Sequence, residues 1–186
     1  MKSKFIDEDI KYIGSQLSPH WIYKKFKIQG DAIVAFIGEC EVNLSEMVDI
    51  EDVINNEPIY SKCMLSFITE QFGISLSEGV FRQRLLMCII KELLEKKGIF
   101  VVRNGDDLMI DGKKLSVSIA TKSLTSILIH TGLNILSEGA PVKASGLQSE
   151  LGINDIKSFA IEVMDRYSSE LDDINMACSK VRGVFE

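Results

Sequence analysis

The stretch Gly105-Asp106-Asp107-Leu108-Met109-Ile110-Asp111-Gly112-Lys113-Lys114-Leu115-Ser116 decides the fold. Asp111-Gly112 is the strongest hairpin signal in the chain, because both residue types tolerate the positive φ of a two-residue turn. Asn104-Gly105 predicts another turn just before it, and residues 99–103 predict a strand leading into that turn. The centre of the chain is therefore expected to consist of short antiparallel strands.

Two longer segments after this stretch also alternate between apolar and polar residues. Residues 113–121 and 125–135 are joined by a short loop, so we predict that they pair antiparallel. A register that places Ala120 near Ser126 makes their apolar faces coincide, as burial of one face demands. The same register brings Ser116 near His130.

The opposite face of this predicted pair combines one lysine with small and polar residues. Small side chains leave room above a sheet, and a lysine among them can place a charge in that room. We therefore interpret this face as the floor of a cleft for an anion such as a nucleotide phosphate or an acyl-phosphate. The alternative is an ordinary solvated outer face of the sheet. The face is formed by Lys114, Ser116, Ser118, His130, Gly132 and Asn134.

Outward from the centre, strands are predicted over residues 31–37 and 39–43, within an extended N-terminal region. Helices are predicted from Ser45 to residue 54, from Ser61 through Phe72, from Ser77 to Lys97, and from residues 154–155 to about 174. This order predicts an α+β fold, with a mostly antiparallel central sheet flanked by helices. No linker or repeat divides the chain, so 1–186 is expected to be a single domain.

Composition narrows the classes of function. The 186 residues are 46% hydrophobic and 26% charged, as in ordinary globular domains. The net charge of −6 disfavours duplex nucleic acid as a partner, although the segment 82–122 is locally basic. No apolar stretch is long enough to span a membrane, and the acidic N-terminus does not suit a secretory signal. We expect a cytoplasmic protein without a membrane partner, whose four cysteines are reduced structural thiols; the flat apolar strands also allow a homodimer.

The central motifs resemble a known family. Residues 105–116 are similar to the signature strand of biotin and lipoate protein ligases, and Gly132-Leu133-Asn134-Ile135 is similar to the strand that follows in biotin ligases. Residues 144–152, with the helix after them, resemble the segment that closes the catalytic domain of those ligases. The similarity covers about Val80 to Leu171, and that sheet is shared with class II aminoacyl-tRNA synthetases. The whole chain is most similar to an uncharacterised group of small prokaryotic proteins with this core.

The resemblance implies a function. Lys114 falls on the lysine that contacts the acyl-adenylate in those ligases, so it is the candidate catalytic residue, with ATP as cofactor and a small carboxylic acid as acyl substrate. Asp106 and Asp107 are candidate magnesium ligands. The phosphate-binding loops of the ligases have no counterpart in the first 80 residues. The alternative is therefore a non-catalytic module that keeps the fold and binds a small anionic or acyl ligand.

Two further groups of residues are candidate ligand contacts. Arg82 and Arg84 could supply phosphate contacts from a helix start, but residues two apart do not share a helix face, so only one of them is expected to do so. Gln16, His20 and Trp21 form a loop that could clamp a planar ligand, with a turn anchored by the tryptophan as the alternative. Gly30 could allow close approach of a ligand, or form a bulge.

Overall fold

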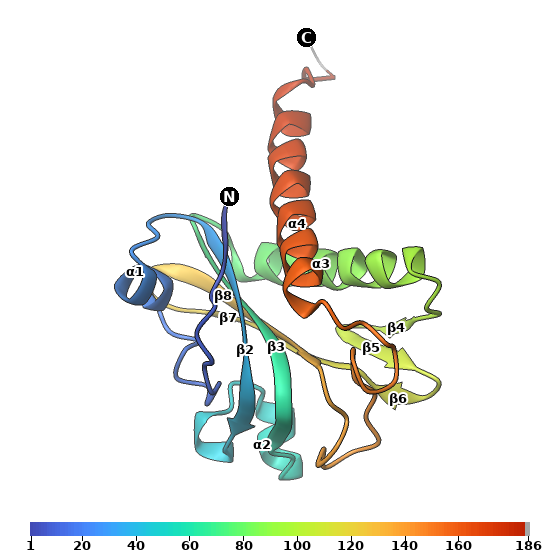
Figure 1. The fold of residues 1–186 in the computed structure, drawn as a ribbon. Coiled ribbons are helices and arrows are strands. Elements are labelled where there is room, and N and C mark those ends of the chain that lie inside the picture. Colours follow the sequence, from blue (N-terminus) through green and yellow to red (C-terminus); the bar gives the residue numbers. More distant parts are fainter. Residues whose placement is uncertain (185–186) are drawn as a thin grey trace.

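The computed structural model of the protein describes residues 1–184 and is built around a five-stranded sheet. The strands lie in the order β1-β2-β3-β8-β7 (Figure 1). β1 is parallel to β2, and the other neighbouring strands are antiparallel. The predicted α+β class, with its mostly antiparallel central sheet, is confirmed. The strand bounds are β1 Lys2–Phe5, β2 Ala32–Val42, β3 Ile59–Phe72, β7 Ser116–Lys122 and β8 Ser126–Asn134.

A second, three-stranded sheet contains most of the segment 105–116. It consists of β4 (Val102–Asn104), β5 (Asp107–Ile110) and β6 (Lys113–Lys114), paired antiparallel in that order. Asp111 and Gly112 join β5 to β6 with φ values of 47° and 72°, which confirms the predicted tight turn.

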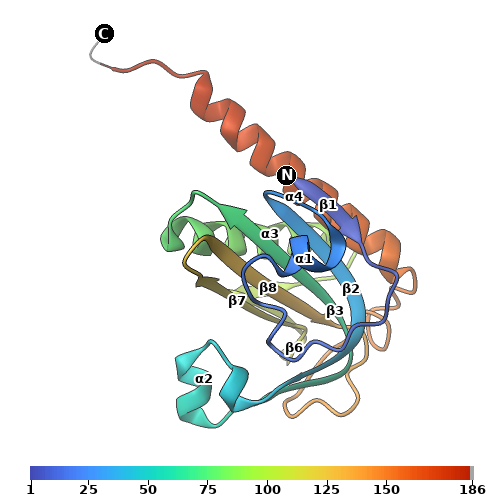
Figure 2. The same cartoon turned by 90° about the vertical axis from the view of Figure 1, so that its left-hand side faces the viewer.

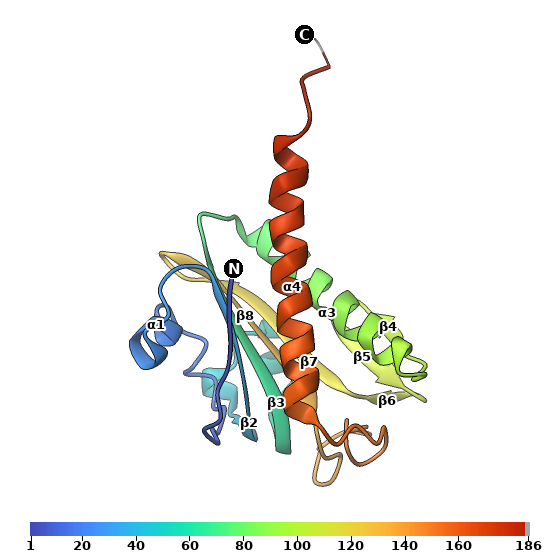
Figure 3. The same ribbon diagram turned by 45° about the horizontal axis from the view of Figure 1, so that its top comes forward.

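Two long helices cover one face of the central sheet. α3 (Leu76–Lys96) lies against β7 and β8, and α4 (Ile156–Ser179) packs against β1 and β2. The C-terminal part of α4 extends beyond the sheet, as Figures 2 and 3 show. The short elements α1 (Trp21–Phe26), η1 (Leu44–Glu46) and α2 (Ile50–Asn55) belong to the other side of the sheet.

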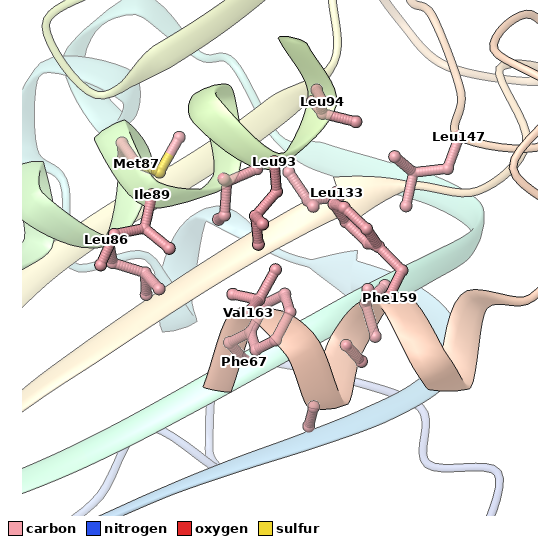
Figure 4. Packing of buried hydrophobic residues seen from close by; sticks show 14 of the residues in the cluster. Phe67, Leu86, Met87, Ile89, Leu93, Leu94, Leu133, Leu147, Phe159 and Val163 are labelled. Atoms are coloured by element: carbon pink, nitrogen blue, oxygen red, sulfur yellow. The ribbon is translucent and has the colours of Figure 1, made fainter. Parts of the chain in front are cut away.

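Each face of the sheet has its own apolar cluster. On the helix side, Phe67 and Leu133 pack with residues of α3 and α4 such as Leu93 and Phe159 (Figure 4). On the other side, Phe36 and Ile68 pack with Ile22 of α1 and with the N-terminal segment. The strands β2, β3 and β8 are therefore buried on both faces over much of their length.

Burial on both faces explains the largest error of the sequence analysis. The helix predicted from Ser61 through Phe72 is wrong, because this segment is the central strand β3. Residues 64–71 are all buried between β2 and β8. A doubly buried strand is a nearly continuous apolar run, which periodicity alone does not distinguish from a buried helix.

Several boundaries also differ. The predicted helix from Ser45 to residue 54 is split into η1 and α2, and α2 is capped by Asp49. Ser75, not Ser77, caps α3 by accepting a hydrogen bond from the Glu78 N–H at 3.1 Å. The predicted strand 99–103 is displaced to residues 102–104. α4 is capped by Asp155, as expected, but continues to residue 179. The N-terminal region, predicted to be extended, contains α1.

The predicted pairing of 113–121 with 125–135 is confirmed for β7 and β8, but the register is wrong. Ala120 pairs with Ile129, and Ser116 pairs with Leu133. The displacement is an odd number of residues, so it reverses which face of β8 accompanies each face of β7. All nine residues of β8 are buried, so matching the apolar faces was not a valid guide.

Candidate functional site

A cavity of about 160 Å³ opens on the side of the sheet opposite α3 and α4. Its floor is formed by Val117 and Ile119 of β7 and His130 of β8. The N-terminal segment around Tyr12 and the segment 46–52 form further walls, and the β4–β5 turn with Lys114 closes one end. We call this cavity the Lys114 pocket.

Lys114 lies in the wall of the pocket but is not free there. Its Nζ forms an ion pair with Asp107 at 3.0 Å, and both side chains are about one third exposed. The short hairpin β5–β6 explains the contact, because it places Asp107 and Lys114 on adjacent antiparallel strands. A ligand anion that approaches Lys114 must therefore displace or share this carboxylate.

The pocket is rich in carboxylates. The Asp106 carboxylate accepts hydrogen bonds from Arg84 Nη1 at 2.8 Å and Gln83 Nε2 at 3.2 Å. Burial raises the pKa of Asp106, and the neighbouring Arg84 opposes that rise. Burial and the nearby Asp49 likewise raise the pKa of Asp52, which a favourable interaction with Lys114 opposes. One ammonium group thus shares the walls with the carboxylates of Glu46, Asp49, Asp52, Asp106 and Asp107.

His130 forms a neutral part of the floor. Its ring stacks on Tyr12, with centroids 3.8 Å apart and planes 14° apart, and its Nε2 lies 3.3 Å from Ser66 Oγ. Burial lowers the pKa of His130 to about 3. The imidazole is therefore uncharged at neutral pH and adds no positive charge to the floor of the pocket.

The corrected register separates the residues predicted for one face. Ser116 Oγ accepts a hydrogen bond from the Leu108 N–H, and Ser118 Oγ bonds to Gln83 of α3 at the edge of the pocket. Asn134 and Ser116 line an adjoining cavity of about 90 Å³ that shares Lys114. A Cβ at Gly132 would stand 2.3 Å from the Met64 sulfur, so a larger residue there would require the Met64 side chain to shift.

The remaining candidates are not brought to this pocket. Arg82 pairs with Glu78 along α3 at 2.6 Å, and Arg84 reaches the pocket wall only through Asp106. The buried Gln16 amide bonds to the backbone of its own loop, at Lys11 and Ile13. The indole of Trp21 packs on Phe26 and Phe36. His20 and Gly30 lie together at a separate cavity near α1.

Comparison with known proteins assigns the family. The model described as a domain of unknown function, DUF366, matches residues 1–182. This chain belongs to the DUF366 family. The uncharacterized protein MJ0805 of Methanocaldococcus jannaschii is 41% identical over 176 residues, which cover 91% of this chain and 79% of that protein. A protein of unknown function from Pyrococcus horikoshi is 39% identical, with a TM-score of 0.92 over 98% of this chain and 100% of that one.

The fold of this DUF366 chain is also that of the protein ligases suggested by its motifs. A biotin protein ligase mutant from Aquifex aeolicus, in complex with biotin, matches with a TM-score of 0.59 at 15% identity, over 92% of this chain and 70% of that one. A lipoate-protein ligase bound with ATP shares the fold as well. The expected ligase-like core is confirmed as a fold.

The residues of this DUF366 chain do not fit the magnesium nucleotide that the ligase resemblance implies. Asp106 is engaged by Arg84 and Gln83, and Asp107 is engaged by Lys114. Within residues 1–184, no three histidine, cysteine or acidic side chains gather to hold a metal ion. A polyphosphate would meet one lysine and many carboxylates, in a cavity smaller than the 300–1,000 Å³ usual for larger ligands.

Sequence reasoning missed part of the pocket of this DUF366 protein. Tyr12 had no signal beyond its aromatic character. The acidic residues of the segment 46–52 fell within the helix predicted from Ser45 to residue 54, and no motif linked them to Lys114. Only the tertiary fold brings this segment, 60 or more residues before β7, over the strand face.

No helix among the described residues has the length and apolar character to cross a membrane.

Proposed function

We propose that this protein binds a small molecule that carries both a carboxylate and an amino group, in the Lys114 pocket. The observation that carries the proposal is the composition of the walls, in which one lysine faces five carboxylates. A purely anionic ligand would be attracted by Lys114 but repelled by the surrounding acids. A ligand with charges of both signs satisfies both, since its carboxylate pairs with Lys114 and its amino group faces the acids.

Two further features support a small ligand. The cavity volume of about 160 Å³ suits a molecule of few heavy atoms. The floor of Val117, Ile119 and neutral His130 offers an uncharged surface for its carbon chain. These features favour a binding module that keeps the ligase fold.

The test is a titration of matched ligands followed by calorimetry. Short amino acids are compared with the same chains lacking either the amino group or the carboxylate. We expect the amino acids to bind more tightly than either analogue. Lys114→Ala should weaken binding by about 1.5–3 kcal/mol, or roughly 10- to 150-fold, the scale of a hydrogen bond between charged groups.

Lys113→Ala is the matched control, because it removes the same charge from the exposed neighbouring residue of β6. It should leave the affinity nearly unchanged. Equal losses in the two variants, or equal binding of acids with and without the amino group, would contradict the proposal.

ATP-dependent activation of a carboxylic acid, followed by acyl or adenylyl transfer, is the second candidate function. The fold shared with protein ligases and the place of Lys114 in the matching motif favour it, whereas the carboxylates and the small volume of the Lys114 pocket oppose it. Exchange of labelled pyrophosphate into ATP, measured with the same panel of acids, separates the two candidates. Exchange that depends on Lys114 would favour the enzyme, and exchange at background level with every acid would favour the binding module.

A further inference from the structure

A second cavity, which shares no residue with the Lys114 pocket, contains a buried carboxylate without a cation. Glu70 of β3 is only 2% exposed. Among residues 1–184 it forms no ion pair with lysine, arginine or histidine. Burial of an ionised carboxylate without a compensating charge is costly, so this position calls for an explanation.

The two oxygens of the Glu70 carboxylate are unequally satisfied. Oε1 accepts the backbone N–H of His20 at 2.8 Å and the hydroxyl of Ser126 at 2.7 Å. Oε2 has no hydrogen-bond donor among the described residues. Because Oε1 is anchored from two sides, the carboxylate is held in place with one acceptor oxygen to spare.

Glu70 lines a cavity with aromatic walls. The cavity has a volume of about 290 Å³ and is lined by Glu70 together with His20, Tyr23 and Phe72. The His20 and Phe72 rings are stacked, with centroids 5.7 Å apart and planes 20° apart. Tyr23 is 45% exposed, so its ring forms the outer wall. We call this cavity the Glu70 pocket.

The neighbouring lysines do not supply the missing charge. Lys24 Nζ is directed to the Pro19 carbonyl oxygen at 3.5 Å, and Lys25 Nζ pairs with Glu8 at 3.4 Å. Lys27 Nζ donates a hydrogen bond to the Lys24 carbonyl oxygen, and Lys2 Nζ donates one to the Gln29 carbonyl oxygen. Each of these four ammonium groups has another partner, so the Glu70 carboxylate is left for a cation that enters the cavity.

We propose that the Glu70 pocket binds a small organic amine in its protonated form. An ammonium group can donate a hydrogen bond to the free Oε2 and gain electrostatic attraction from the carboxylate. The aromatic faces around it favour a cation over a neutral ligand. The apolar remainder of the wall, including Ile28, suits an alkyl chain better than a bare metal ion, and Glu70 is the only acidic residue of the lining.

The inference is tested with n-butylammonium as the probe, n-butanol as its neutral counterpart and tetramethylammonium as a cation without N–H donors. Titrations of the full chain are followed by NMR. We expect saturable binding of n-butylammonium that shifts the Tyr23 and Phe72 signals. Tetramethylammonium should bind several-fold more weakly, and n-butanol should not bind measurably.

Glu70→Gln keeps the size of the side chain and its acceptor for His20, and removes the charge. It should weaken n-butylammonium binding at least tenfold. Asp52→Asn is the matched control, because it removes one acid from the Lys114 pocket and should leave these shifts unchanged. Tyr23→Leu changes an exposed position and should weaken n-butylammonium binding several-fold without affecting the fold. If Glu70→Gln does not fold, Tyr23→Leu tests whether the Glu70 pocket binds the amine.

Unchanged affinity in both Glu70→Gln and Tyr23→Leu would overturn the proposal. So would equal binding of n-butanol, or shifts confined to the Lys114 pocket. None of these outcomes depends on whether the Lys114 pocket binds the ligand proposed for it, because the two cavities share no residue and the Tyr23 and Phe72 signals report on the Glu70 pocket.

Discussion

At the scale of single residues, His130 links burial to pH. An exposed histidine takes up a proton near pH 6.5, whereas burial lowers the pKa of His130 to about 3. Between these values the unfolded chain binds more protons than the folded chain, so the free energy of unfolding falls as the pH falls. The stability gained by keeping His130 neutral is fully present above about pH 6.5 and is lost progressively below it.

The first prediction uses His130→Phe, which keeps an aromatic ring against Tyr12 but cannot titrate. Between pH 7 and pH 5 the wild type should lose about 2 kcal/mol of unfolding free energy through this residue. Urea unfolding at both pH values measures the loss in each protein. The variant should lose about 2 kcal/mol less than the wild type, and parallel losses would show that His130 is not buried as a neutral group.

The second prediction concerns the ion pair between Lys114 and Asp107. Asp107→Asn removes the carboxylate that competes with a ligand for Lys114. The pair is partly exposed, so the gain should be limited to about 0.5–1 kcal/mol, or roughly two- to fivefold in affinity for a small acid without an amino group. Calorimetric titration measures this gain, and unchanged or weaker binding would show that Asp107 does not compete at this lysine.

At the scale of elements, a local turn could be predicted from the sequence, whereas a strand that depends on long-range pairing could not. The Asp111-Gly112 turn could be predicted because the φ values of two adjacent residues decide it. The nature of the segment 61–72 could not, because Met64, Leu65 and Ile68 have helical spacing. Pairing with β2 and β8 decides that they form a strand, and one sequence does not reveal that pairing.

The third prediction tests the start of α3. Ser75 accepts the Glu78 N–H, whereas Ser77 bonds only to the Ser75 hydroxyl. Ser75→Ala should therefore lower the free energy of unfolding by about 1 kcal/mol, the usual cost of losing an N-cap. Ser77→Ala should cost only about a few tenths, as at ordinary surface positions. Denaturant unfolding of both variants checks the order, and a larger loss for Ser77→Ala would place the cap there.

At the scale of the whole molecule, the candidate site depends on segments that are distant in the sequence. Lys114 and His130 could be predicted as neighbours of one cleft, because a short loop joins the segments 113–121 and 125–135 that contain them. Tyr12 and Asp52 could not, since the folded sheet alone carries them to the same cavity. The register between β7 and β8 also depends on the whole fold. Both faces of β8 are covered, so its apolar pattern does not indicate which residues of β7 it pairs with.

The fourth prediction is that the chain unfolds as a single domain. Trp21 reports on the cluster beside α1, whereas the far-UV circular dichroism signal is dominated by α3 and α4 on the other face. The strands between these layers are shared, so the two signals should change in one coincident transition in urea. Midpoints that differ between the two probes would indicate separate folding units.

The central claim, that Lys114 anchors a small ligand in an acidic pocket, is tested most directly by a crystal structure with a bound amino acid. The account predicts that the ligand carboxylate lies within hydrogen-bond distance of Lys114 Nζ, with the ion pair to Asp107 broken or shared and the amino group facing Asp49 or Asp52. A ligand bound elsewhere, with the pair between Lys114 and Asp107 still intact, would contradict it.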